Sequence, residues 1–322
     1  EAPARATTPS HRLLLRAAMI HQLGSGIYSY MPLAWRSLAK IEAIVAEEMD
    51  RVDGQRIGMP VVQPADLWQK SGRWDSIGRE MIRFRDRDDH EMVLAVTHEE
   101  VVADLAAQHV TSYRDLPKML YQIQTKFRDE ARSRGGLIRV REFVMKDAYS
   151  FHASEADLDD YYDRMVHAYV RIFRRCGLDP LVVEGDVGMM GGSASHEFML
   201  PTDIGEDTLL TCGDCGYAAN RDVASSLLKE ATPAAPEAIE EVATPGHTTI
   251  ESVANYLDVS TSGTLKAVFY VAGDDMVVAA IRGDLDVNER KLAAALQVGE
   301  IRHASDQELD QAGIVPGYAS PI

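Results

Sequence analysis

The chain has 322 residues, of which 46% are hydrophobic, and its 50 acidic side chains against 33 basic ones give a formal charge of −17. This length is enough for one large or two ordinary hydrophobic cores. The acidic excess argues against a protein coated with basic charge for general nucleic-acid binding, but it does not exclude a local basic site. No apolar run reaches about 18 residues, which excludes a membrane-spanning helix.

Two features of the sequence bear on the compartment and on metal binding. Residues 1–9 lack a basic region followed by an apolar core, so we expect no signal peptide. The three cysteines, Cys176, Cys212 and Cys215, are too few for a disulfide framework, which favours a cytoplasmic protein. Because a structural zinc site needs four ligands, the single C-x-x-C at Cys212 and Cys215 favours two free thiols and no metal.

A long helix is the first element that the sequence predicts. It begins near Pro32 and ends before Gly54, as helix-start and helix-stop signals suggest. Its apolar stripe, spaced by three and four residues, consists of Trp35, Leu38, Ile41, Val45 and Met49. A strand over Ile57–Val62 is predicted next, at a sheet edge because Pro60 lies inside it.

Another helix, a hairpin and a further helix are predicted downstream. The helix spans Thr97–Gln108 and opens with a T-x-x-E capping box. Two β-rich runs, Leu120–Phe127 and Leu137–Met145, are joined by a polar loop and predict an antiparallel hairpin. A helix capped by Ser154 and ended by Gly177 follows.

The composition changes near residue 222. Residues 222–260 carry seven acidic side chains against one lysine, a net of −6, with three prolines among alanines. Such a stretch is typical of a linker, so we predict two domains, residues 1–221 and residues 222–322. The second domain is predicted to start with a cap at Thr248 and Glu251 and to contain strands Leu265–Val271 and Met276–Ile281 and a helix over Glu289–Gln297.

The stretch from Tyr113 to Lys146 is a basic island in this acidic chain. It holds nine basic and four acidic residues, a net of +5. One interpretation is a solvated hairpin face. The other is a polyphosphate site, because the arginine guanidinium matches phosphate geometry and is always charged.

The residues inside the island match a known pattern. Phe127-Arg128-Asp129-Glu130, a short loop and Arg139-Val140-Arg141-Glu142-Phe143 resemble motif 2 of class II aminoacyl-tRNA synthetases. The chain as a whole resembles the bacterial type of prolyl-tRNA synthetases. The strings that carry this resemblance include Ser71-Gly72-Arg73-Trp74, Thr97-His98-Glu99-Glu100, Met145-Lys146-Asp147-Ala148-Tyr149-Ser150-Phe151-His152 and Gly191-Gly192-Ser193-Ala194-Ser195-His196.

The resemblance implies a fold and a role for each matching residue. The fold is α+β: a class II antiparallel sheet with flanking helices, plus an inserted mixed α/β editing domain that is truncated here. Catalysis falls to Arg128, Glu130 and Arg139, which also bind ATP together with Phe143. Proline binding falls to Thr97, Glu99, Arg128, Met145, Tyr149 and His196.

The residues alone favour plainer roles for several of these positions. Thr97 is favoured as a helix cap, His196 as a core histidine, and Phe143 and Met145 as packing residues of a strand. The loop Arg132-Ser133-Arg134-Gly135-Gly136 departs from the family's usual Arg-Pro-Arg, which predicts a more flexible loop.

The second domain resembles the editing insertion of the same family. Its matching strings include Gly263-Thr264-Leu265-Lys266 and Ile281-Arg282-Gly283-Asp284. The resemblance implies hydrolysis of Ala-tRNA(Pro), since a pocket that fits proline cannot strongly reject the smaller alanine. Lys266 is the implied editing residue, whereas without the family it reads as an ordinary strand lysine.

The resemblance implies ATP-dependent joining of L-proline to tRNA(Pro), with Mg²⁺, by a cytoplasmic homodimer that forms through the motif 1 region, residues 10–60, and does not bind membranes. No G-x-G-x-G-x-x-R string follows Phe198, and no anticodon-binding domain is present. We therefore expect the front portion of a longer enzyme or a degenerate chain. The alternatives are a non-catalytic synthetase-like binding protein, a trans-editing hydrolase and, more remotely, threonine or serine specificity.

Overall fold

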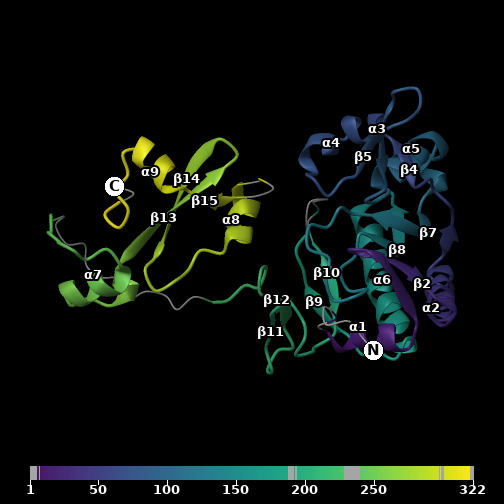
Figure 1. Ribbon diagram of the computed structural model, residues 1–322, viewed down its shortest axis with the longest axis horizontal. Helices are drawn as coiled ribbons and strands as arrows, with labels where there is room; N and C mark the ends of the chain where they lie inside the picture. Colours follow the sequence, from purple (N-terminus) through teal and green to yellow (C-terminus); the bar gives the residue numbers. More distant parts are fainter. Residues whose placement is uncertain are drawn as a thin grey trace. The chain divides into compact units, whose positions relative to one another are not determined.

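The structure is a computed structural model. It describes residues 6, 8–187, 192, 194–227, 240–296, 298 and 301–319. The chain forms two compact units (Figure 1): the first unit comprises Glu1–Val182 and Phe198–Glu206, and the second unit comprises Val183–Glu197 and Asp207–Ile322. The predicted domain boundary at 221/222 stays a prediction.

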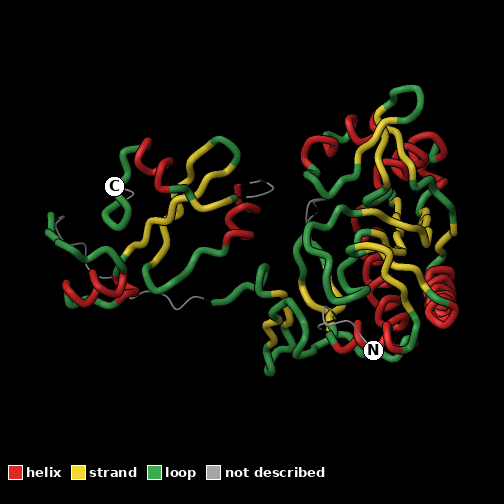
Figure 2. Tube along the Cα trace, viewed as in Figure 1, coloured by secondary structure: helices red, strands yellow, loops and turns green. Residues whose placement is uncertain are grey.

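The first unit consists of small sheets with helices packed beside them, as the strands and helices in Figure 2 show. Its helices are α1 (Pro9–Arg16), α2 (Pro32–Asp50), α3 (Ala65–Lys70), α4 (Arg73–Ser76), α5 (Glu99–His109), the 3₁₀ turn η1 (Tyr113–Asp115) and α6 (Glu155–Arg175). Its strands are β1 (Ile20–Gly24), β2 (Ile27–Tyr30), β3 (Gly54–Arg56), β4 (Val62–Pro64), β5 (Arg83–Arg85), β6 (Glu91–Leu94), β7 (Lys118–Phe127) and β8 (Glu142–Phe151). The sheets are β1-β2, β3-β7-β8 and β4-β6-β5.

The β7–β8 hairpin is the long antiparallel element of the first unit, and it confirms the predicted hairpin. Its register runs without a break from Lys118 opposite Phe151 to Phe127 opposite Glu142. The second strand begins at Glu142 and not at Leu137, because Arg134 and Arg139 instead pair with each other across the loop through two backbone hydrogen bonds of 3.0 and 3.1 Å.

Helices α2 and α6 are confirmed and pack on each other. Ser154 caps α6 by accepting the backbone N–H of Asp157 at 3.3 Å, and Gly177 follows its end at φ +83°. The core on this side contains Met49, Val52, Met119, Tyr121, Tyr161, Ala168 and Ile172. The α2 stripe is only partly buried, however: Trp35 remains 58% exposed, whereas Met49 is fully enclosed.

Two local predictions in this unit are wrong. Residues 57–61 form no strand, because Pro60 has no N–H and the Met59 N–H donates to the Gln122 side chain at 2.9 Å. The expected capping box is also missing: α5 starts at Glu99 with His98 at the N-cap, so Thr97 lies one residue too early to accept a backbone N–H of the helix, and its hydroxyl donates to the Glu99 carboxylate.

The second unit carries a four-stranded sheet, β10-β9-β12-β11, and a three-stranded sheet, β14-β13-β15. Its elements, in chain order, are β9 (Leu181–Glu184), β10 (His196–Met199), β11 (Leu209–Thr211), β12 (Ala218–Asn220), α7 (Ile250–Leu257), η3 (Thr261–Gly263), β13 (Leu265–Ala272), β14 (Asp275–Arg282), α8 (Glu289–Leu296), β15 (Arg302–His303) and α9 (Asp306–Gln311). The unit boundary passes through β9 and β10.

The two predicted strands of the second unit are confirmed as β13 and β14, which pair antiparallel along their whole length. The predicted cap lies one residue off: Thr249 and Ser252, and not Thr248 and Glu251, form the capping box of α7. The last residue of the predicted helix over Glu289–Gln297 and residues 228–239 of the predicted linker lie outside the described residues.

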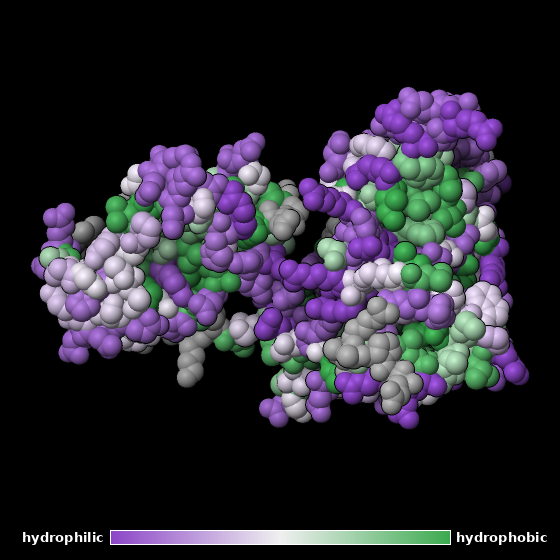
Figure 3. All heavy atoms as spheres, viewed as in Figure 1, coloured by the Kyte–Doolittle hydropathy of each residue, from purple (hydrophilic) through white to green (hydrophobic). Residues whose placement is uncertain are grey.

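Hydrophobic and hydrophilic side chains alternate over the face seen in Figure 3, on both units. Among the described residues, no helix is both long and apolar enough to cross a membrane.

Candidate active site

The β7–β8 hairpin presents a row of functional side chains on one face. Residues directly opposite each other in a ladder point to the same side of the sheet. Gln122 lies opposite Asp147, Gln124 opposite Met145, and Lys126 opposite Phe143. Leu120 and Tyr149 extend the same face. Three residues predicted from the family, Phe143, Met145 and Tyr149, therefore share this face.

Asp147 lies at the centre of a buried polar cluster on this face. Its Oδ1 accepts from Lys126 Nζ at 2.7 Å. Its Oδ2 accepts from Gln122 Nε2 at 2.9 Å and from the Tyr149 hydroxyl at 2.6 Å. Lys126 is 0% exposed, and burial lowers its pKa while Asp147 opposes this shift.

Thr97 and Glu99 border the cluster from the segment that enters α5. The Gln63 side chain holds the Thr97 carbonyl oxygen at 3.2 Å, and the Thr97 hydroxyl donates to Glu99. Glu99 is the first residue of α5, where the helix dipole favours a carboxylate. Burial and the Glu99 charge raise the pKa of Tyr149, and the Thr97 side chain is close enough to oppose this shift. The structure therefore brings Thr97, Glu99 and Tyr149 together.

His98 lies behind these residues and is fully buried. Its Nε2 is 3.0 Å from the Pro60 carbonyl oxygen, and its Nδ1 is 3.8 Å from Asp147 Oδ2. Burial and the nearby Lys126 charge lower the pKa of His98, so the imidazole is neutral at pH 7. The neutral ring donates its Nε2–H to the Pro60 carbonyl oxygen and so supports the backbone turn before α5.

The arginines predicted for ATP lie at the open end of the hairpin and are exposed. Arg128 stacks over the Phe143 ring with its guanidinium carbon 5.5 Å from the ring centre. Glu130 accepts from Arg139 Nε at 3.0 Å and from the Arg132 backbone N–H at 3.1 Å. That backbone hydrogen bond, and then the Arg139 charge, lower the pKa of Glu130. The structure therefore brings Glu130 together with Arg139, and Arg128 together with Phe143.

The β1–β2 hairpin holds the arginine-bearing loop in place. The Ser25 and Ser133 hydroxyls are 2.6 Å apart, and the Arg141 N–H donates to the Gly26 carbonyl oxygen at 2.9 Å. Gly26 has φ +70°, and a Cβ there would lie 2.8 Å from the Ser133 Cβ, so only glycine fits. A cavity of about 350 Å³ lies between the two segments and is lined by residues that include His11, Tyr28 and Arg134.

Two predicted site residues belong to the second unit. His196 is the first residue of β10 and is exposed, so its predicted part in the proline pocket stays a prediction. Lys266 Nζ lies 2.9 Å from Asp286 Oδ1. Lys266 also lines a cavity of about 630 Å³ together with Thr264, His303 and Gly317.

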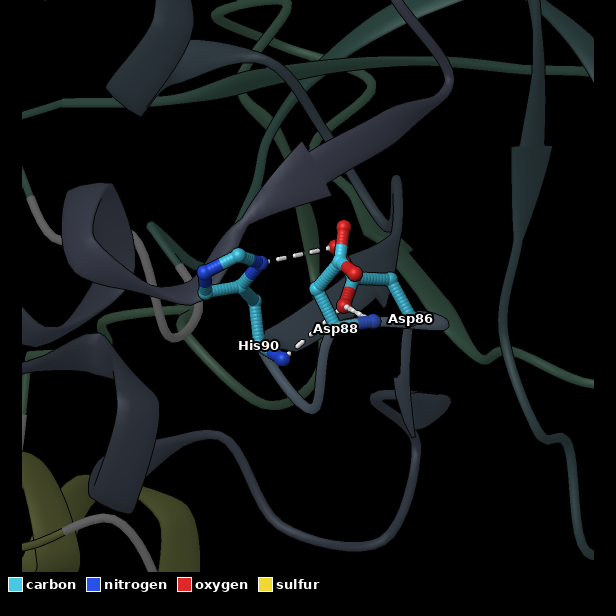
Figure 4. A group of neighbouring side chains, drawn as sticks. All are labelled: Asp86, Asp88 and His90. Atoms are coloured by element: carbon cyan, nitrogen blue, oxygen red, sulfur yellow. Dashed lines mark hydrogen bonds and ion pairs between the residues drawn. The ribbon is translucent and has the colours of Figure 1, made fainter.

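Side chains suited to a metal gather on the turn between β5 and β6. Within the described ranges, Asp86, Asp88 and His90 are the one group of three such side chains whose ligand atoms lie within 4.8 Å of one another. The His90 ring is directed at Asp86 (Figure 4), and its Nδ1 lies 3.0 Å from Asp86 Oδ2. All three are exposed, and Asp86 also accepts the backbone N–H groups of Asp88 and His90 at 2.9 Å. The hydrogen bonds within the turn are therefore enough to hold these three side chains close together.

Sequence reasoning missed Gln122, Lys126, His98 and Asp147 as members of the site. A signal was available for three of them. Gln122 and Lys126 are polar residues at even spacing on a strand, and Asp147 lies midway between Met145 and Tyr149. Period-two alternation therefore places all three on the face of the predicted pocket.

A comparison with family models matches residues 82–311 to the tRNA synthetase class II core domain (G, H, P, S and T). Among curated relatives, the proline–tRNA ligase of Dehalococcoides mccartyi strain 195 is 52% identical over all of this chain and 57% of its own length. That of Salinispora tropica is 50% identical over all of this chain and 56% of its own length. The chain thus spans little more than half the length of these relatives.

Solved structures with a similar fold include two eukaryotic prolyl-tRNA synthetases. The Giardia lamblia enzyme in complex with prolyl-adenylate has a TM-score of 0.54 and 21% identity, covering 58% of this chain and 40% of that one. The Cryptosporidium parvum enzyme complexed with L-proline and AMP has a TM-score of 0.52 and 17% identity, covering 58% and 39%. At this identity, the similarity shows a shared fold.

Proposed function

Since the chain belongs to the family of class II tRNA synthetase core domains, we propose that it activates L-proline with ATP for transfer to tRNA(Pro). One observation carries the choice of amino acid. The Glu99 carboxylate at the start of α5 accepts a hydrogen bond from Thr97 and lies near Tyr149 of the β7–β8 hairpin, which gives this place an acidic group and several hydrogen-bond acceptors. A cationic secondary amine with two N–H donors fits such a pocket. The proline–tRNA ligases that are 50–52% identical to this chain over its whole length support this choice.

The proposed reaction needs positioning and charge stabilisation more than acid–base catalysis. The proline carboxylate attacks the α-phosphorus of ATP; an oxygen–phosphorus bond forms and the bond to the β-phosphate bridge breaks, releasing pyrophosphate. Arg128 orients the carboxylate and the α-phosphate, while Phe143 stacks on adenine. The terminal ribose hydroxyl of tRNA(Pro) then attacks the prolyl carbonyl, and AMP leaves.

Arg139 can turn to the phosphates at small cost. Its present partner, Glu130, holds it in an ion pair that solvent reaches mainly from the Arg139 side, and a pair open to solvent contributes little to stability. Mg²⁺ enters with ATP as part of the substrate. The exposed cations of the loop suit a polyphosphate that carries its own metal.

The test is exchange of labelled pyrophosphate into ATP, driven by single amino acids, with the complete reading frame expressed. We expect exchange with L-proline, and its loss in Arg128→Gln. Exchange driven by threonine or serine, and not by L-proline, would show that the protein activates one of those amino acids instead. No exchange from a folded protein that still binds L-proline would favour a non-catalytic binding protein.

The position of Lys266 favours a second activity, hydrolysis of Ala-tRNA(Pro). Lys266 lines the cavity of the second unit, whose wall is so close that a Cβ on Gly317 would lie 2.7 Å from the Thr248 Cβ. We expect Lys266→Ala to abolish release of alanine from Ala-tRNA(Pro). Lys291→Ala is the matched control, because Lys291 instead donates to the Ala224 carbonyl oxygen. Equal release by both variants would exclude Lys266 from editing.

We also propose a cytoplasmic homodimer through the motif 1 region. Exposed apolar side chains gather in this part of the sequence: Leu13, Leu23, Met31, Leu33, Trp35 and Ile41. Such a set is typical of a surface that another subunit covers.

A further inference from the structure

The buried ion pair between Lys126 and Asp147 adjoins the proposed proline pocket but takes no part in the proposed reaction. Lys126 is 0% exposed, and Asp147 is 8% exposed. Removing two charges from water costs free energy, and the attraction between the charges does not always compensate for this cost. Two hydrophobic side chains could fill the same space between β7 and β8 without this cost. We therefore look for a function of the Lys126–Asp147 pair in the pocket beside it.

Every side chain that contacts Asp147 at hydrogen-bond distance donates to it. Lys126 has only donors. The Gln122 carbonyl oxygen accepts the Met59 backbone N–H at 2.9 Å, so its NH₂ group is the one that faces Asp147. Asp147 is therefore an acceptor toward all of its partners, and the Tyr149 hydroxyl must give it its single proton.

The fixed proton decides what Tyr149 offers to its other neighbours. With the proton on the Asp147 side, the phenol oxygen presents only lone pairs to the side where Thr97 and Glu99 lie. The pocket is then lined by acceptors, which suit a ring nitrogen with N–H donors. A ring of the same shape with an oxygen in place of nitrogen meets lone pairs and is rejected.

We propose that the buried Lys126–Asp147 pair is a positioning device that fixes the Tyr149 hydroxyl as a hydrogen-bond acceptor and thereby makes the pocket select a donor-bearing ring. This inference rests on the proposed function. Asp147→Asn reverses the direction of the hydrogen bond between residue 147 and the Tyr149 hydroxyl. The Asn oxygen turns to Lys126, which can only donate, so the Asn NH₂ takes the place of Oδ2. The hydrogen bond from the Gln122 NH₂ is then lost, and the Asn NH₂ donates to the Tyr149 oxygen, so the phenol proton moves toward the pocket.

The experiment compares two ligands of equal shape, L-proline and (S)-tetrahydrofuran-2-carboxylate, by titration calorimetry on this chain. The wild type should prefer L-proline. In Asp147→Asn the ratio of the two affinities should fall about tenfold, the effect of mispairing one buried polar group. An unchanged ratio in a folded variant overturns the inference.

The first unit offers a matched control for this substitution. The Tyr121 hydroxyl donates to Asp50 Oδ1 at 2.7 Å, and Tyr121 lies on the other face of β7. Asp50→Asn and Tyr121→Phe should leave the ligand ratio unchanged. In a Tyr149→Phe background, Asp147→Asn should produce no further change in the ratio, because Asp147 acts through that hydroxyl. Additive losses would show a merely structural role.

A second variant, Lys126→Met, tests the inference if Asp147→Asn fails to fold. A measurement without ligand separates a failure of this inference from a failure of the proposed function. In Lys126→Met the Asp147 carboxylate loses the cation that holds its Oδ1 and is no longer fixed opposite the Tyr149 hydroxyl, so the ratio should fall in the same way. Without ligand, the ¹³Cζ resonance of Tyr149, identified by its loss in Tyr149→Phe, should shift in Lys126→Met and Asp147→Asn. A wild type that binds no L-proline refutes the proposed function; an unmoved resonance refutes the fixed hydroxyl.

Discussion

At the scale of single residues, charge and polarity matter more in this site than shape. Glu99 and Glu100 are neighbours in α5 but serve different partners. Glu99 meets Thr97, whereas Glu100 accepts from Ser71 and Arg73, both at 3.0 Å. The first partner lies in the proposed pocket, and the second pair ties α5 to the α3–α4 region.

Glu99→Gln keeps the volume of the side chain and removes its charge. We expect the KM for L-proline to rise about 100-fold, because the ammonium group loses a half-buried anionic partner, and a hydrogen bond to a charged group contributes about 1.5–3 kcal/mol. Amino-acid-dependent pyrophosphate exchange measures this change. The KM for ATP should remain the same, and an equal rise in both constants would contradict the assignment.

Phe143→Leu removes the ring beneath Arg128. The ring–guanidinium contact and the proposed adenine stacking together contribute about 1–2 kcal/mol, so we expect the KM for ATP to rise about tenfold with an unchanged KM for L-proline. Phe84→Leu on β5 is the control and should change neither constant. A selective effect on L-proline would place Phe143 in the other subsite.

At the scale of elements, α2 and α6 are joined by a carboxylate that apolar periodicity cannot predict. Glu48 is 0% exposed, and it accepts from Arg51, Arg171 and Arg175 at 2.7–2.9 Å. Burial alone would raise the pKa of Glu48. The hydrogen bonds from Arg171 and Arg175 together outweigh this effect, so the pKa of Glu48 is lowered.

Glu48→Gln should lower the free energy of unfolding by about 2 kcal/mol, less than for a fully buried pair because the arginines can turn to water. Glu47→Gln is the control: Glu47 is 57% exposed in its pair with Arg175, and its loss should cost under about 0.5 kcal/mol. Urea unfolding at pH 7 measures both, and equal effects would contradict this account.

The contribution of Glu48 also has a defined pH dependence. Its folded pKa lies below the unfolded value of about 4.3, so the stabilisation is complete above that pH and declines as the pH falls through the folded pKa. The difference in unfolding free energy between wild type and Glu48→Gln should therefore shrink below about pH 4.3. A constant difference down to pH 3 would be the contrary result.

The hairpins and long helices could be predicted from the sequence because their signals are local. The β7–β8 pattern alternates, and Pro32, Ser154 and Gly177 mark helix ends. The absence of the Thr97 cap could not be predicted, since it depends on where α5 starts, which is at Glu99, one residue later than a Thr97 cap requires. The direction of the Gln122 amide depends on Met59, 63 residues away. Such competition between partners is decided only by the folded arrangement.

At the scale of the whole molecule, the proposed dimer depends on the exposed front of α2. Trp35 is 58% exposed, and Trp35→Glu places a charge where we expect a dry interface. We expect the dimer dissociation constant to rise at least about 100-fold, measured by sedimentation equilibrium. Tyr113→Glu, at a 71% exposed site on η1, is the control. A monomeric wild type at micromolar concentration would contradict the dimer.

The assignment of residues 198–206 to the first unit, between two stretches of the second, has a consequence for biosynthesis. A ribosome that has just added Val182 must still make the 24 residues from 183 to 206 before the first unit has all of its chain. At about 5–20 residues per second, this takes about 1–5 s. Codon choice across this stretch therefore sets how long a nearly finished nascent unit waits for its closing segment.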